Sequence, residues 1–85
     1  MNTKDLNQNM KKLEELIGYG YERYKSYLSQ EEQKMCSMYL YEQGEYEEAL
    51  TNLIAILHEH KIELDGETQD KFEEARSLMK LDKTS

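Results

Sequence analysis

Apolar residues recur every three or four positions along most of the chain, which is the spacing of an amphipathic α-helix. Over residues 3–28 they form one stripe: Leu6, Met10, Leu13, Ile17, Tyr21, Tyr24 and Leu28. Gly18 and Gly20 interrupt this helix, and each costs about 1 kcal/mol relative to alanine in a helix interior. Because the stripe keeps its phase across both glycines, the pattern favours one kinked helix over two separate helices.

A second helix is predicted to begin at about Gln30. Ser29 and Glu32 have the spacing of a capping box, in which each side chain binds the other residue's backbone N–H. This helix carries Met35, Met38, Tyr39 and either Tyr41 or Glu42. Gly44 then suits a left-handed C-terminal position. With almost no loop, residues 30–43 and 45–60 should form an antiparallel helical hairpin.

The helix from Glu45 to about His60 has the clearest pattern in the chain. Six apolar residues share one of its faces: Tyr46, Ala49, Leu50, Leu53, Ile54 and Leu57. In the connecting segment that follows, Ile62 and Leu64 could reach the core.

A last helix is predicted from about Glu67 to Leu81, capped by Asp65 after a turn at Asp65-Gly66. Its apolar face comprises Phe72, Ala75, Leu78 and Met79. Residues 80–85 should fray. Without a linker or low-complexity segment, residues 1–85 are expected to form one compact all-α domain of four or five helices.

Composition excludes several classes of protein. No apolar stretch approaches the roughly 18–20 residues that a membrane-spanning helix requires. The first five residues also lack the apolar core of a secretory signal. The single cysteine cannot form an internal disulfide, as is usual in a reducing compartment. We therefore expect a cytoplasmic protein without a membrane partner.

The net charge is −7, and residues 44–60 contribute four glutamates without any lysine or arginine. Such a chain is a poor ligand for nucleic acid, because phosphate binding depends on lysine and arginine. An acidic surface instead attracts a basic protein and mainly raises its association rate. The candidate contact residues are Glu42, Glu45, Glu47 and Glu48.

Candidate catalytic and metal-binding residues are few. His58 and His60 are two positions apart, so on a helix their rings point in different directions and do not share one metal ion. Cys36 has no activating base nearby in sequence and is interpreted as a buried structural cysteine. We expect no enzymatic activity, no cofactor and no metal.

The seven tyrosines are more numerous than the core stripes need. Tyr21 and Tyr24 fit the first stripe, whereas Tyr19 falls beside it, and Tyr39 and Tyr41 do not both face inward. Exposed tyrosines beside acidic residues are typical of protein interfaces. Tyr19, Tyr39 and Tyr41 are therefore candidate aromatic anchors, with the alternative that tyrosine simply fills a small core.

Residues 41–50 resemble the turn and second helix of a tetratricopeptide repeat, with Gly44, Tyr46 and Ala49 at the expected places. That architecture needs stacked copies about 34 residues apart, and no second copy is visible. The resemblance therefore implies a repeat-like hairpin rather than a repeat protein.

A longer resemblance, over residues 39–82, is to the MafI-type family of small bacterial immunity proteins. It is carried by Gly44, Glu45, Tyr46, Ala49, Leu50, Leu53, Glu59, Ile62, Asp65, Phe72 and residues 77–82. The chain departs from the family pattern at Thr51, where an acidic residue is common, and at Lys80, where glycine is usual.

The MafI resemblance implies an acidic helical protein that binds and neutralises the toxic domain, commonly a nuclease, of a polymorphic secreted toxin. Two other functions remain open from the residues alone. One is a tetratricopeptide-like adaptor that binds a peptide or helix in a groove. The other is a structural homodimer joined through exposed tyrosines.

Overall fold

The computed structural model describes the backbone of residues 3–84 and the side chains of residues 10–80. Within this part of the chain, all regular structure is helical, which confirms the predicted all-α class. The elements are α1 (Thr3–Tyr24), a 3₁₀ turn η1 (Lys25–Tyr27), α2 (Gln30–Ser37), a π-helical turn η2 (Met38–Glu42), α3 (Tyr46–Glu59) and α4 (Gly66–Thr84).

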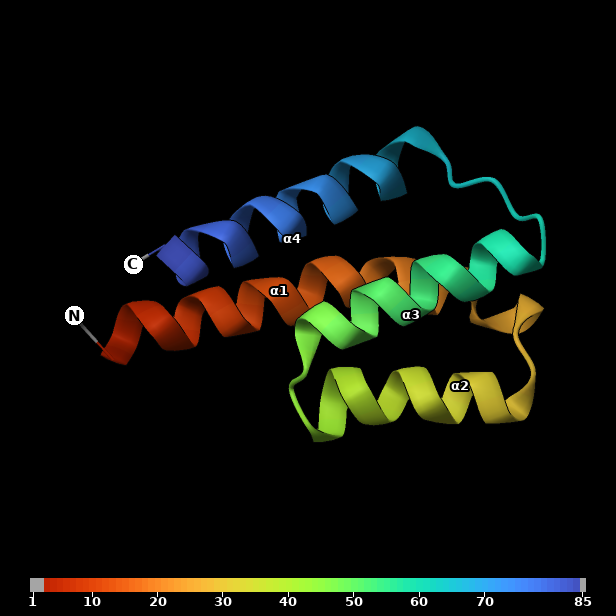
Figure 1. The fold of residues 1–85 in the computed structure, drawn as a ribbon, viewed down its shortest axis with the longest axis horizontal. Coiled ribbons are helices and arrows are strands. Elements are labelled where there is room, and N and C mark those ends of the chain that lie inside the picture. Colours follow the sequence, from red (N-terminus) through yellow and green to blue (C-terminus); the bar gives the residue numbers. More distant parts are fainter. Residues whose placement is uncertain (1–2, 85) are drawn as a thin grey trace.

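The helices form two antiparallel pairs along the long axis of the molecule (Figure 1). α1 and α4 lie side by side and make the most extensive contact between two elements. α2 and η2 turn back into α3, as predicted, and α3 also contacts α1 and α4. The resulting body is elongated, about 40 × 26 × 17 Å.

The hydrophobic core lies where α1, α3 and α4 meet, with α2 and η2 closing one side. Its centre consists of side chains that are at most 2% exposed: Ile17, Cys36, Leu40, Ala49, Leu50, Leu53, Leu57, Phe72 and Ala75. The predicted stripe of α1 is confirmed at Leu13, Ile17, Tyr21, Tyr24 and Leu28. Ile62 and Leu64 pack half-buried against this core, as expected.

The prediction of a buried side chain is wrong at one position of the α1 stripe. Met10 is 40% exposed, because the first turns of α1 extend beyond the end of the α2–α3 hairpin (Figure 1). The side chain of Leu6 lies outside the described residues. Sequence reasoning also missed the buried residues Leu16, Ile56 and Thr68.

The two glycines do not divide the first helix, which is continuous from Thr3 to Tyr24. Both instead allow close packing. A Cβ at Gly20 would lie 2.2 Å from Cζ of Phe72, and a Cβ at Gly18 would lie 3.0 Å from the Tyr41 hydroxyl. Gly20 therefore lets α4 approach α1, and Gly18 lets the Tyr41 side chain lie on α1.

The second helix changes from an α-helix to a π-helical turn after Ser37. In η2 the Gln43 N–H donates to the Met38 carbonyl at 2.9 Å, five residues back, so the turn is wider than in an α-helix. The centrally buried residues here are Cys36 and Leu40, while the predicted Met35, Met38 and Tyr39 are only half-buried.

Three predicted helix boundaries are confirmed. Ser29 and Glu32 form both bonds of the capping box, and Gly44 is left-handed, with φ +64°. The Thr68 N–H donates to Oδ1 of Asp65 at 2.7 Å, which caps α4. α4 continues to Thr84, beyond its predicted end at Leu81. The fraying of residues 80–85 stays a prediction, and Ser85 lies outside the described residues.

Candidate protein-binding surface

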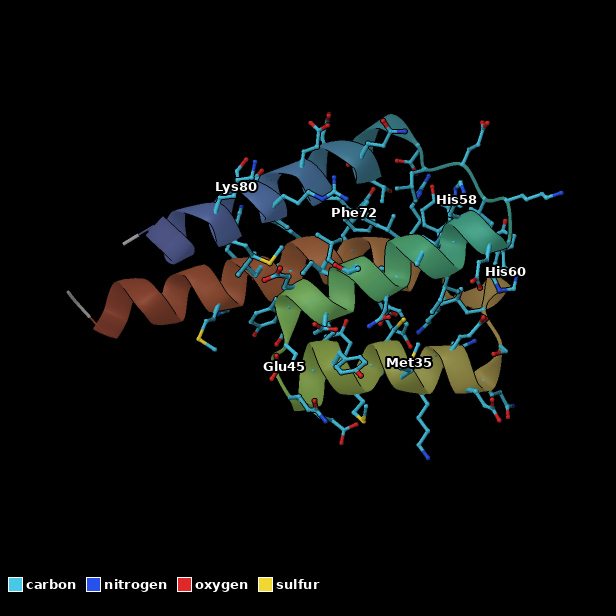
Figure 2. The ribbon with its side chains drawn as sticks, viewed as in Figure 1. Met35, Glu45, His58, His60, Phe72 and Lys80 are labelled. Atoms are coloured by element: carbon cyan, nitrogen blue, oxygen red, sulfur yellow. The ribbon has the colours of Figure 1, made fainter. Side chains whose placement is uncertain are left out.

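All four predicted glutamates are exposed, at the turn between η2 and α3 and in the first turn of α3. We call Glu42, Glu45 and Glu48 the acidic elbow. None of the three forms an ion pair with a described side chain, and their carboxylates are exposed to solvent. The Glu45 N–H donates to the Tyr39 carbonyl at 2.8 Å, so a closed, hydrogen-bonded turn holds them in place. Figure 2 shows Glu45 at the end of the hairpin opposite His60.

The fourth glutamate, Glu47, faces a different neighbour. It lines a hollow of about 230 Å³ between α3 and α4, together with Leu50, Thr51, Arg76, Met79 and Lys80. Because Arg76 and Lys80 of α4 line the same hollow, Glu47 faces basic residues of its own chain. We therefore do not count it in the acidic elbow.

The three candidate tyrosines have different surroundings. Tyr39 is half-buried and packs against the core. Tyr41 is 43% exposed, and its ring meets that of Tyr21 edge-on with 6.3 Å between centroids. Tyr19 is half-buried at the seam with α4, where Nζ of Lys71 lies 4.7 Å from the ring centroid.

Tyr19 and Tyr41 come together at one shallow hollow on the surface of α1. This tyrosine hollow has a volume of about 340 Å³ and is lined by Glu14, Glu15, Gly18, Tyr19, Glu22 and Tyr41. Sequence reasoning found the two tyrosines but missed the three α1 glutamates. Glu14, Gly18 and Glu22 are spaced by four and share a helix face, but only the tertiary structure places Tyr41 on it.

The tyrosine hollow is acidic. Glu14 and Glu15 form no ion pair with a described side chain, whereas Glu22 pairs with Nζ of Lys25 at 2.7 Å. Partial burial raises the pKa of Tyr41 above its usual value, and the neighbouring carboxylates of Glu22 and Glu14 raise it further. A cation entering the hollow would thus meet carboxylates and the side chain of a tyrosine.

His60 has a local structural role that His58 does not share. Nε2 of His60 lies 2.9 Å from Oε1 of Glu32, which joins the end of α3 to the start of α2. The Ser29 backbone N–H, and secondly His60, lower the pKa of the Glu32 carboxyl. No three metal-ligating side chains gather in the described part of the chain. Cys36 is buried, as predicted, and burial raises the pKa of its thiol.

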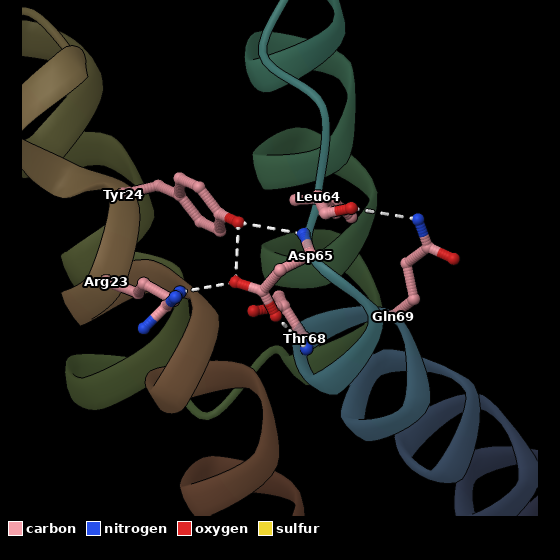
Figure 3. Close-up of polar contacts among 6 residues, drawn as sticks. All are labelled: Arg23, Tyr24, Leu64, Asp65, Thr68 and Gln69. Atoms are coloured by element: carbon pink, nitrogen blue, oxygen red, sulfur yellow. Dashed lines mark hydrogen bonds and ion pairs between the residues drawn. The ribbon is translucent and has the colours of Figure 1, made fainter.

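The most connected polar cluster centres on Asp65 (Figure 3). Its Oδ2 accepts from the Tyr24 hydroxyl at 2.9 Å and from Nε of Arg23, while the Asp65 N–H donates to the Tyr24 hydroxyl at 3.0 Å. The Thr68 N–H, and then Tyr24 and Arg23, hold the pKa of the Asp65 carboxyl far below its usual range. The Asp65 carboxylate is thus fully engaged within the chain, so the cluster joins α1 to α4 and is not a candidate site. The buried Oγ1 of Thr68 beside it has no hydrogen-bond partner among the described residues.

Comparison with known proteins finds no matching protein-family model, no similar curated protein and no similar solved structure. Among the described residues, no helix combines the length and apolar character needed to cross a membrane.

Proposed function

We propose that this chain is an immunity protein that binds a cognate toxin domain with a basic surface, such as a nuclease, and neutralises it in the cytoplasm. The observation that carries the proposal is the acidic elbow: Glu42, Glu45 and Glu48 are exposed and make no ion pair within the described residues. The resemblance of residues 39–82 to the MafI-type family supports the same function.

The chemistry of the elbow suits a nuclease target. A nuclease cleft binds a polyanion, so its arginines and lysines are available to carboxylates that are held in a fixed arrangement. Charge-assisted hydrogen bonds between these groups are roughly twice as strong as neutral ones. The protein can block the cleft directly or bind beside it and exclude substrate sterically.

Co-expression with the product of the adjacent upstream gene tests this function. We expect the two proteins to co-purify as a stable complex and the toxicity of that product to disappear. The matched control is the same toxic domain expressed without this chain. Persistent toxicity in the presence of soluble, folded chain would overturn the proposal.

An adaptor that binds a helical peptide is the second candidate, and one observation favours it. Next to the hollow that contains Glu47 lies another of about 150 Å³, lined by Ile54, Leu64, Gln69, Phe72, Glu73 and Arg76. The two hollows share Arg76 and have apolar floors, as in grooves that bind amphipathic helices. An adaptor would bind linear peptides, whereas a homodimer, the third possibility, would show only self-association.

A further inference from the structure

We propose that the tyrosine hollow receives one arginine side chain of the basic partner protein, so that α1 contributes to recognition together with the acidic elbow. This inference rests on the proposed function for the identity of the partner. It assigns a binding role to Glu14 and Glu15 on α1 and to Tyr41 in η2, which is far from them in the sequence and meets them only in the folded chain.

Charge indicates that the occupant is a cation. The hollow contains three carboxylates, and only that of Glu22 is paired with a described side chain. The unpaired Glu14 and Glu15 can bind a guanidinium group through two parallel hydrogen bonds. The protein that carries the guanidinium would exclude water from this contact and so strengthen the attraction.

The aromatic surface favours arginine over lysine. A planar guanidinium stacks on a tyrosine ring while it binds a carboxylate, which the compact ammonium group of lysine does less well. Tyr41 is held edge-on against Tyr21 and remains 43% exposed, so its ring is both positioned and accessible. Tyr19 already binds one cation within the chain, because Lys71 lies over its ring.

The shape of the hollow indicates a side chain carried by a protein rather than a free metabolite. The site is shallow and open to solvent, so a small ligand would stay largely hydrated. Met10, four residues before Glu14, adds an exposed apolar side chain to the same face of α1. A protein that inserts an arginine here would also cover Met10 and Tyr41, two of the large hydrophobic side chains exposed in the described structure.

The test uses three capped pentapeptides with arginine, lysine or citrulline at the centre of four alanines. Each is titrated into the full chain while backbone amides and tyrosine rings are followed by NMR. We expect the arginine peptide to shift the Gly18 amide and the Tyr41 ring saturably. It should bind about two- to fivefold more tightly than the lysine peptide, from the size of a cation–aromatic contact at an exposed site. The neutral citrulline peptide should show no saturable shift.

Variants locate the binding. Tyr41→Leu and the double variant Glu14→Gln/Glu15→Gln should each abolish the preference for arginine. Glu63→Gln, at the other end of the molecule, and Glu45→Gln/Glu48→Gln in the elbow should keep it. The glutamine variants change exposed or half-buried side chains only, so they remain informative if Tyr41→Leu fails to fold.

The outcomes separate the two proposals. Equal shifts at all acidic residues, or arginine binding unaffected by the hollow variants, would overturn the role of the hollow. If the upstream product is neutralised with equal affinity by the hollow variants, the immunity function stands and this inference fails. If that product is not bound at all while the arginine preference maps to Gly18 and Tyr41, the hollow remains an arginine-binding site and the immunity function fails.

Discussion

At the scale of single residues, the effect of a glycine in this chain depends on what packs against it and not only on helix propensity. Gly20 weakens α1 as a helix but permits the approach of Phe72, which is 2% exposed. Gly66, at the start of α4, has no heavy atom near the position of a Cβ. The same residue type is therefore a packing requirement at one position and a source of excess flexibility at the other.

In Gly20→Ala the new methyl group overlaps a buried ring, which costs about 1–3 kcal/mol. Because alanine gains roughly 1 kcal/mol over glycine in a helix, we expect the free energy of unfolding to fall by up to about 2 kcal/mol. Gly66→Ala is the matched control and should be neutral or stabilising by up to about 1 kcal/mol. Urea unfolding of both variants measures the difference; equal effects would contradict the packing role of Gly20.

Lys61 offers a second test at this scale, since it ends α3 in the left-handed conformation with φ 59°. Lys61→Gly should be more stable than Lys61→Ala by about 1 kcal/mol, because only glycine adopts this conformation without strain. Alanine controls for the loss of the charge. Thermal unfolding of the two variants at equal concentration gives the comparison, and a more stable alanine variant would contradict it.

At the scale of elements, Asp65 caps α4 and also fixes α4 to the end of α1. The carboxylate receives hydrogen bonds from Tyr24 and from the Thr68 backbone in addition to the Arg23 guanidinium. Sequence analysis found the cap but not the partners, because they lie about forty residues away in the chain. One short side chain thus determines both where a helix begins and where it packs.

The pH dependence of stability should report this cluster. Because folding lowers the pKa of Asp65, its contribution is fully present above the usual aspartate pKa and is lost as the pH falls below about 4. Asp65→Asn should therefore be less stable than the parent chain at pH 7, by a margin that is constant to about pH 5 and shrinks below pH 4. Urea unfolding at each pH measures this margin. Asp70→Asn, on the exposed side of α4, is the control: its difference in stability from the parent chain should not shrink in this way at low pH.

At the scale of the whole molecule, the negative charge is not spread evenly. The acidic elbow and the tyrosine hollow both involve the η2 turn, which carries Glu42 and Tyr41, whereas Lys12 and Glu74 pair across α1 and α4 at 3.6 Å. An uneven field of this kind steers a basic partner toward one region of the surface before contact is made.

Charge reversal should show which end of the molecule meets the partner. Glu45→Lys/Glu48→Lys should slow association with the toxin domain that we propose as partner about tenfold or more at low salt, and flatten the salt dependence of the association rate. Glu59→Lys/Glu63→Lys makes the same charge change at the other end of α3 and should have a smaller effect. Stopped-flow association between about 20 and 300 mM NaCl distinguishes them. If both double variants slowed association equally, the association rate would depend on the net charge of the chain and not on the position of the glutamates.

The sequence by itself determined the helices, their caps and most of the core. The reason is that periodicity, the Ser29–Glu32 pair and the Asp65 cap act within one or two turns of the chain, where spacing alone fixes geometry. It also predicted the exposed carboxylates of the elbow, because Glu42, Glu45 and Glu48 flank the sharp turn at Gly44. The π-helical turn η2 was not determined in this way, since it depends on what packs against it. The phase of the apolar stripe favoured one helix across Gly18 and Gly20, but the close packing that these glycines allow is seen only in the tertiary structure.

Only the tertiary structure decided which charged and aromatic residues share a surface. Glu47 was predicted with its neighbours but faces the bases of α4, while Glu14, Glu15 and Tyr41 line one hollow. A helix can turn about its axis or slide along its neighbour at little local cost, so contacts between helices are fixed by the fit of side chains such as Phe72 against Gly20. That fit is a property of the whole packed core, and no single stretch of sequence contains it.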